Sequence, residues 1–140
     1  MELRFQKATR DKIDLVVSTR MEVLDSVSQG YGETLHPAIE QETRQYFERE
    51  LGKGYEAYFV YHQEEFVGCG GICFTQIVPT VENHTGKAAI IVNMYTRPAW
   101  RGKGIAYQLL DVLVQEAMAR GVSEISLEST PQGATLYKRY

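Results

Sequence analysis

The residues of this sequence that are best suited to chemistry form the run Arg101-Gly102-Lys103-Gly104-Ile105-Ala106, between an apolar segment and an amphipathic one. Gly102 and Gly104 permit tight backbone conformations and present bare N–H groups. Arg101 and Lys103 add positive charge beside them. A helix that begins here directs further N–H groups, and the positive end of its dipole, toward the same point. The run therefore predicts a binding site for a phosphate or pyrophosphate group.

The spacing within this run excludes two common phosphate-binding motifs. A P-loop requires G-x-x-x-x-G-K-[ST], which the run does not supply. The dinucleotide fingerprint G-x-G-x-x-G fails because Tyr107 occupies the position of its third glycine, and no βαβ unit opens the chain. The pattern R-x-x-G-x-A does fit, at Arg101, Gly104 and Ala106. Taken alone, this short pattern is equally compatible with an ordinary strand–helix turn that carries exposed cations.

Hydrophobic periodicity predicts the elements that must hold this run in place. A buried strand over 87–96 precedes it, and an amphipathic helix over 104–120 follows it and stops at Gly121. The other expected elements are a short strand at 3–5, a helix over 11–27, a helix opened by Pro37 and continuing through 41–51, a β-hairpin of strands 55–61 and 66–78, a strand at 125–127 and the start of a helix at 134–140. This order favours a mixed α/β (α+β) domain rather than a doubly wound sheet. In the second strand of the hairpin, Gly68, Gly70 and Gly71 predict a bulge or a close backbone approach.

Length and composition indicate a single domain over residues 1–140. A chain of 140 residues can bury roughly 70% of the surface that its unfolded form exposes. No stretch approaches about 18 consecutive apolar residues, and the charged first residues do not resemble a signal peptide. We therefore expect no membrane span and a cytoplasmic location.

Net charge and cysteine content argue against nucleic-acid binding, a disulfide framework and a metal site. The formal net charge of −3 argues against nucleic-acid binding, which usually requires a basic excess. Cys69 and Cys73 are too few for a disulfide framework or, by themselves, for a zinc site. Their spacing places both on one face of a strand, as in a redox pair, but small buried thiols are the favoured interpretation. We expect no metal site.

Together these features resemble the GNAT (GCN5-related) superfamily of N-acetyltransferases over nearly the whole chain. The pattern R-x-x-G-x-A, within NMYTRPAWRGKGIA, is similar to the coenzyme A pyrophosphate motif of that family, and the late run LYKRY is similar to its Leu-Tyr signature. The resemblance implies a mixed, mostly antiparallel sheet with helices on both faces. It also implies acetyl-CoA as the donor and a primary amine as the acceptor.

The resemblance implies a role for particular residues. The pyrophosphate would be held by backbone N–H groups of Arg101, Gly102, Lys103, Gly104, Ile105 and Ala106. The pantetheine arm would pair with Met94, Tyr95 and Thr96 as an added strand, and an N–H group of residues 93–95 would stabilise the oxyanion. Tyr137 would be the general acid that protonates the departing thiolate. Tyr31 and Glu33, between the first two helices, would contact the acceptor.

Three departures from the family pattern leave alternatives open. No carboxylate lies in 87–90, where some members carry a glutamate base, so the candidates are Glu33, Glu82, His84, Glu128 or a chain of water molecules. Thr130 stands where many members have an asparagine. The sequence also stops after LYKRY, where members usually continue with two further strands. We expect a longer gene product, an unusually small fold, or an edge covered by a partner chain, and we predict a homodimer for a chain that ends at 140.

Three functions are compatible with these features. The first is an acetyl-CoA-dependent N-acetyltransferase that acts on a small or peptide amine by direct transfer in a ternary complex. The second is a non-catalytic acyl-CoA-binding or sensing domain on the same fold, and the third is a phosphate- or nucleotide-binding module. Our hypothesis is the first.

Overall fold

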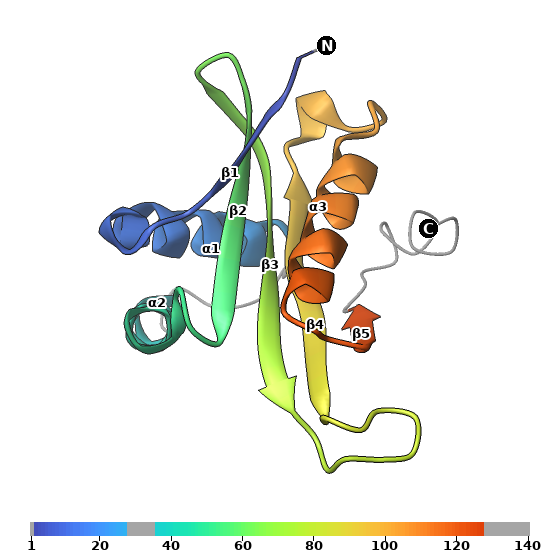
Figure 1. Ribbon diagram of the computed structural model, residues 1–140. Coiled ribbons are helices and arrows are strands. Elements are labelled where there is room, and N and C mark those ends of the chain that lie inside the picture. The colour runs from blue at the N-terminus through green and yellow to red at the C-terminus, as the bar shows by residue number, and fades with distance from the viewer. Residues whose placement is uncertain (1, 28–35, 128–140) are drawn as a thin grey trace.

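The computed structural model describes residues 2–27 and 36–127, whose strands form one five-stranded sheet in the order β1-β2-β3-β4-β5 (Figure 1). The strands are β1 (Arg4–Lys7), β2 (Tyr55–His62), β3 (Glu65–Gln76), β4 (Lys87–Thr96) and β5 (Glu124–Leu127). The helices are α1 (Ile13–Val27), α2 (His36–Glu50) and α3 (Ile105–Ala119), with 3-10 turns η1 (Arg10–Lys12) and η2 (Pro98–Trp100). Neighbouring strands are antiparallel except β4 and β5, which are parallel. The mixed, mostly antiparallel sheet is thus confirmed.

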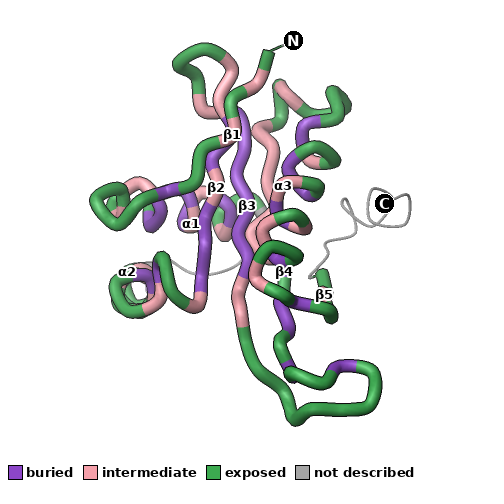
Figure 2. The backbone as a smooth tube through the Cα atoms, viewed as in Figure 1, coloured by how far each residue is buried: buried purple, intermediate pink, exposed green. Residues whose placement is uncertain are grey.

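The two faces of the sheet are covered by different helices. Helices α1 and α2 lie on one side and α3 lies on the other (Figure 1). Successive residues of β2 alternate between the two resulting cores, since side chains on a strand point to opposite faces. Tyr55, Ala57 and Phe59 belong to the core beneath α1 and α2, whereas Tyr58 and Val60 pack with α3. The buried residues follow the middle of the sheet (Figure 2), with one core on each face.

A close approach between α3 and the sheet depends on Gly70 in β3. A Cβ atom at this position would lie 2.7 Å from Sδ of Met94 and 3.0 Å from Cδ2 of Leu109. The β3–β4 register shifts at the same place, so that Gly70 lies opposite both Asn93 and Met94. Asn93 has a φ angle of 63°, in the left-handed region. The glycines of this strand predicted a bulge or a close backbone approach, and the structure contains both.

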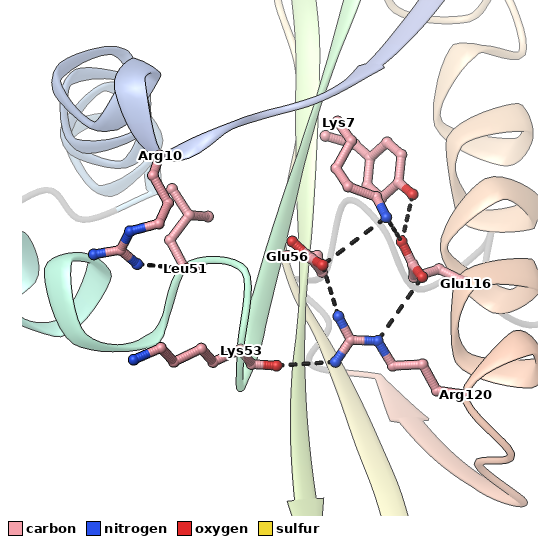
Figure 3. Close-up of polar contacts among 8 residues, drawn as sticks. Lys7, Arg10, Leu51, Lys53, Glu56, Glu116 and Arg120 are labelled. Carbon is pink, nitrogen blue, oxygen red and sulfur yellow. Dashed lines mark hydrogen bonds and ion pairs between the residues drawn. The ribbon is translucent and has the colours of Figure 1, made fainter.

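A polar network fixes the C-terminal half of α3 against β1 and β2 (Figure 3). The ammonium of Lys7 lies 2.5 Å from Oε1 of Glu116, and the Tyr58 hydroxyl donates to the same oxygen at 2.7 Å. Arg120 lies 2.6 Å from the buried carboxylate of Glu56. Burial alone would raise the pKa of Glu116, but Lys7 and Tyr58 outweigh it and the pKa is lowered. The network therefore holds an ionised carboxylate and sets how α3 lies on the sheet.

The observed elements follow the predicted order closely. Helix α2 contains Pro37 in its first turn, as predicted. The beginning of the predicted helix over 11–27 is a 3-10 turn. None of the helices within the described ranges combines the length and apolarity of a membrane span. The predicted final helix lies outside the described residues and the predicted homodimer concerns a second chain, so both stay predictions.

Candidate functional site

The glycine-containing run forms a tight turn between β4 and α3 (Figure 1). Gly102 and Gly104 have φ angles of 77° and 80°, and Gly104 is the N-cap residue of α3. A Cβ atom at Gly102 would meet no atom within 4 Å, and one at Gly104 would meet only the side-chain amide of Gln108, at 4.0 Å. The space beside both glycines is therefore open, as a bound phosphate group requires.

The electrostatics of this turn favour an anion. The first four N–H groups of an α-helix have no acceptor within the helix, and in α3 they face the same open end. Arg101 and Lys103 are exposed on the turn. Nε of Arg101 donates to the carbonyl oxygen of Thr96 at 2.9 Å, which holds this guanidinium at the end of β4. The turn thus combines helix N–H groups and two cations, which suits a pyrophosphate.

The end of β4 presents a strand edge next to this turn. Within the described residues, β5 pairs only with 88–91 of β4, whereas β4 continues to Thr96. Met94 packs on the α3 side of the sheet and Tyr95 on the α1 side. The structure therefore brings the two predicted cofactor-binding segments, 94–96 and 101–106, together, with the Arg101–Thr96 hydrogen bond joining them.

An ion pair fastens the beginning of the turn to α1. Arg97 donates from Nε and Nη2 to the two carboxylate oxygens of Glu22, at 3.2 and 3.1 Å. Hydrogen bonds from Arg97 lower the pKa of Glu22, against the effect of burial, and Tyr95 contributes a further hydrogen bond. Glu22 is consequently held ionised by Arg97, and the lowered pKa makes it a weaker base than an unpaired glutamate. Sequence reasoning did not single out this pair, because its members are 75 residues apart.

A cavity of about 340 Å³ lies on the other side of β4, beneath α1 and α2. The polar side chains that line it come from both helices and from the sheet: Arg20, Glu42, Thr43, Tyr46, Tyr55 and Cys73. The hydroxyl of Tyr46 lies 3.6 Å from Sγ of Cys73. Cys69 is buried, as predicted, but Cys73 is only partly buried and faces this cavity.

The cavity adjoins the bulge of β4. Nη1 of Arg20 donates to Oδ1 of Asn93 at 3.0 Å, and Val92, the preceding residue, lines the cavity. Met94, the following residue, packs on the α3 side. The bulge therefore lies between the cavity and the strand end that is suited to a pantetheine arm. An amine in the cavity and an acyl group at the strand end would meet here.

Two of the predicted base candidates lie far from the glycine turn. Glu82 and His84 are exposed in the loop that precedes β4, whereas the glycine turn follows it. Since β4 has 10 residues, the two ends lie roughly 30 Å apart at about 3.3 Å per residue. Tyr137, Tyr31, Glu33 and Glu128 lie outside the described residues.

Sequence reasoning missed the side chains of Arg20 and Asn93, since it named only the backbone N–H groups of 93–95. Asparagine adopts the left-handed region more readily than most residues. This weak preference and the glycines of β3 are the local signals of the bulge. In the sequence pattern, Arg20 occupies one polar position of an amphipathic helix. Only the fold places it beside β4.

Comparison with known proteins identifies relatives of this chain. Residues 21–140 match the family described as "Acetyltransferase (GNAT) family". A crystal structure of a predicted acetyltransferase with acetyl-CoA from Clostridium acetobutylicum is 31% identical, with a TM-score of 0.87, covering 99% of this chain and 88% of that one. A GCN5-related N-acetyltransferase from Ralstonia eutropha JMP134 shares the fold at 20% identity, with a TM-score of 0.86 and coverage of 99% and 90%.

A third solved structure shares the fold more distantly. Glucosamine-6-phosphate N-acetyltransferase from Arabidopsis thaliana is 15% identical, with a TM-score of 0.66, covering 99% of this chain and 90% of that one. No curated protein sequence matches this chain with significance.

Proposed function

Because this chain belongs to the GNAT acetyltransferase family, we propose that it transfers the acetyl group of acetyl-CoA to a primary amine by direct attack within a ternary complex. The acceptor is a small molecule or a peptide. The observation that carries this proposal is the bulge at Asn93, with the glycine turn and strand end on one side and the cavity on the other.

The residues present fit the donor. The open space beside Gly102 and Gly104, the exposed N–H groups of α3 and the charges of Arg101 and Lys103 suit its pyrophosphate. The backbone of 94–96 suits the amide groups of its pantetheine arm as an added strand. A relative that is 31% identical was crystallised with acetyl-CoA, and this finding supports the same donor for the present chain.

The chemistry needs a proton acceptor, a hydrogen-bond donor to the developing oxyanion and a proton donor. The donor supplies an activated acyl carbon when it is bound. The neutral amine forms a bond to that carbon, the carbon–sulfur bond breaks, and the proton of the amine passes to a base or to water. A backbone N–H group of 93–95 stabilises the negative charge that develops on the carbonyl oxygen. Tyr137 donates a proton to the departing sulfur.

A second candidate is a domain that binds or senses acyl-CoA without catalysis. Glu22 favours this alternative, because the carboxylate that contacts the β4 end is already paired with Arg97, which lowers its pKa and makes it a weak base. A base must then come from elsewhere, such as Glu33 or Glu128, or from a chain of water molecules. The binding of donor is common to both candidates, and only the second lacks turnover.

Two measurements on the full chain separate the candidates. Calorimetry tests whether CoA binds. Release of free thiol from acetyl-CoA is then followed with a panel of amino acids, amino sugars, polyamines, aminoglycosides and peptide N-termini. Thiol release that depends on an amine supports the transferase. Binding of CoA without thiol release across the panel favours the sensing domain, and absence of CoA binding contradicts both.

A further inference from the structure

We propose that the cavity between α1, α2 and the sheet selects amines that also carry an anionic group, a carboxylate or a phosphate, and that Arg20 binds this group. The inference rests on the proposed function, because it names the class of acceptor for the same site. It is carried by the position of one guanidinium group in a cavity that is otherwise lined by aromatic rings, a thiol, neutral groups and one separate carboxylate, that of Glu42.

Arg20 lies at the inner side of the cavity, against the sheet. It donates to the side chain of Asn93 at 3.0 Å, and its charge acts on the buried groups Tyr55 and Cys69. Within residues 2–27 and 36–127, no carboxylate lies within ion-pair distance of Arg20; Glu22, two residues along α1, pairs with Arg97 instead. A partly buried guanidinium that finds no counter-ion among the described residues favours an anion, so an anion that enters the cavity is stabilised there.

The walls of the cavity strengthen this preference. Burial raises the pKa values of the Tyr46 and Tyr55 hydroxyl groups well above their ordinary range, so both hydroxyls stay neutral. Phe47 and Val92 complete the apolar part of the lining. Electrostatic attraction is stronger beside such groups than in water. The guanidinium of Arg20 is therefore the only positive charge among the described residues that line the cavity.

One acidic side chain completes the pattern. Glu42, on α2, is exposed and lines the same cavity, but it lies outside ion-pair distance of Arg20. The cavity thus offers one cation and one separate anion. A zwitterionic amine matches both, because its ammonium group is attracted to Glu42 and its carboxylate or phosphate to Arg20. A polyamine or an aminoglycoside instead brings only positive charge toward Arg20.

The test compares acceptors in matched pairs with the full-length protein and acetyl-CoA. Tyrosine is compared with tyramine, and glucosamine 6-phosphate with glucosamine, so that each pair differs by one anionic group and the two pairs distinguish carboxylate from phosphate. Spermidine serves as the cationic reference. We expect kcat/KM to be at least about tenfold higher for the anionic member of one pair, since a hydrogen bond to a charged group contributes about 1.5–3 kcal/mol.

Substitution of Arg20 tests whether this residue causes the preference for anionic acceptors. Arg20→Met should raise KM for the anionic acceptor by about tenfold or more and abolish the preference, while Arg20→Lys should restore part of it. Arg44→Met is the matched control, because Arg44 is also a helical arginine but pairs with Asp14 at an exposed position. An Arg20 that only supports Asn93 would instead lower kcat for all acceptors alike, and that result would overturn the inference.

A binding measurement separates this inference from the proposed function. Calorimetry of the same amines, with CoA present, does not depend on turnover. If no amine is acetylated but an anionic amine binds and Arg20→Met removes the binding, the proposed function fails and the inference stands. If amines are acetylated with no preference for an anionic group, the proposed function stands and the inference fails. Absence of both acetylation and anionic-amine binding overturns the inference.

Discussion

Arg97 binds both carboxylate oxygens of Glu22, at 3.2 and 3.1 Å, and so joins α1 to the residue that directly follows β4. The same guanidinium donates to the carbonyl oxygen of Phe66 at 3.2 Å, at the beginning of β3. One side chain thus connects three elements at the entrance to the glycine turn. The pair determines where the turn lies relative to the cavity beneath α1.

Removal of the Glu22–Arg97 pair should lower the free energy of unfolding by an amount that depends on pH. We expect Glu22→Gln to lower the free energy of unfolding by about 0.5–1 kcal/mol near neutral pH, because both side chains are partly exposed and solvent screens them. The pKa of Glu22 is lowered in the folded protein, so its contribution is complete above the ordinary glutamate pKa of 4.5. It is lost as the pH falls through the lowered value. Urea unfolding of both proteins at several pH values measures the difference.

The control for this prediction is the exposed pair of Asp14 and Arg44, at 2.6 Å. The side chain of Asp14 is 87% exposed, and we expect Asp14→Asn to change the unfolding free energy less than Glu22→Gln does. Equal effects of the two substitutions would show that the Glu22–Arg97 pair has no special structural role.

Valine at Gly104 should abolish CoA binding. The φ angle of 80° is unfavourable for a side-chain-bearing residue by about 1–2 kcal/mol, and the new side chain enters the space that we assign to the pyrophosphate. Gly52→Val is the matched control, because Gly52 has a φ angle of 84° and open space around it but lies between α2 and β2. Both variants should lose similar stability in thermal unfolding. If calorimetry shows equal CoA affinity for the two variants, the pyrophosphate site lies elsewhere.

Phenylalanine at position 137 should slow acetyl transfer without weakening donor binding. General acid catalysis contributes about 10²-fold or more, and Tyr137→Phe removes the proton that the departing sulfur needs. We expect kcat, measured by thiol release, to fall by about that factor while the calorimetric CoA affinity is unchanged. Tyr61→Phe, in β2, provides the comparison. Unchanged turnover in Tyr137→Phe would remove Tyr137 from the mechanism.

The two thiols should react at very different rates. Cys69 is 1% exposed, and burial raises its pKa to about 12, whereas Cys73 is partly exposed in the cavity. We expect a thiol-specific reagent to label Cys73 first and Cys69 only after unfolding. Cys73→Ser should remove the fast phase, and an amine bound in the cavity should slow it. Faster labelling of Cys69 would contradict the arrangement of β3 against α1.

Features that depend on local conformation could be predicted from the amino-acid sequence. The periodicity of 87–96 and 104–120 predicted β4 and α3 closely, and Gly104 marked their junction, because left-handed backbone favours glycine wherever the chain folds. The glycines of β3 likewise predicted a bulge or a close approach, which Gly70 makes with α3. Neighbours in the chain suffice for each of these predictions.

Which distant side chains lie together depends on how the helices pack on the sheet, and this could not be predicted from the sequence. Arg20 comes to lie beside Asn93, 73 residues away, because the apolar faces of α1 and the sheet exclude water together. Glu82 is much closer to the glycine turn in sequence, but the extended length of β4 holds it at the opposite end of the sheet. The glycine turn is local and its conformation was therefore predicted, whereas the cavity is built from α1, α2 and three strands and forms only when these elements pack.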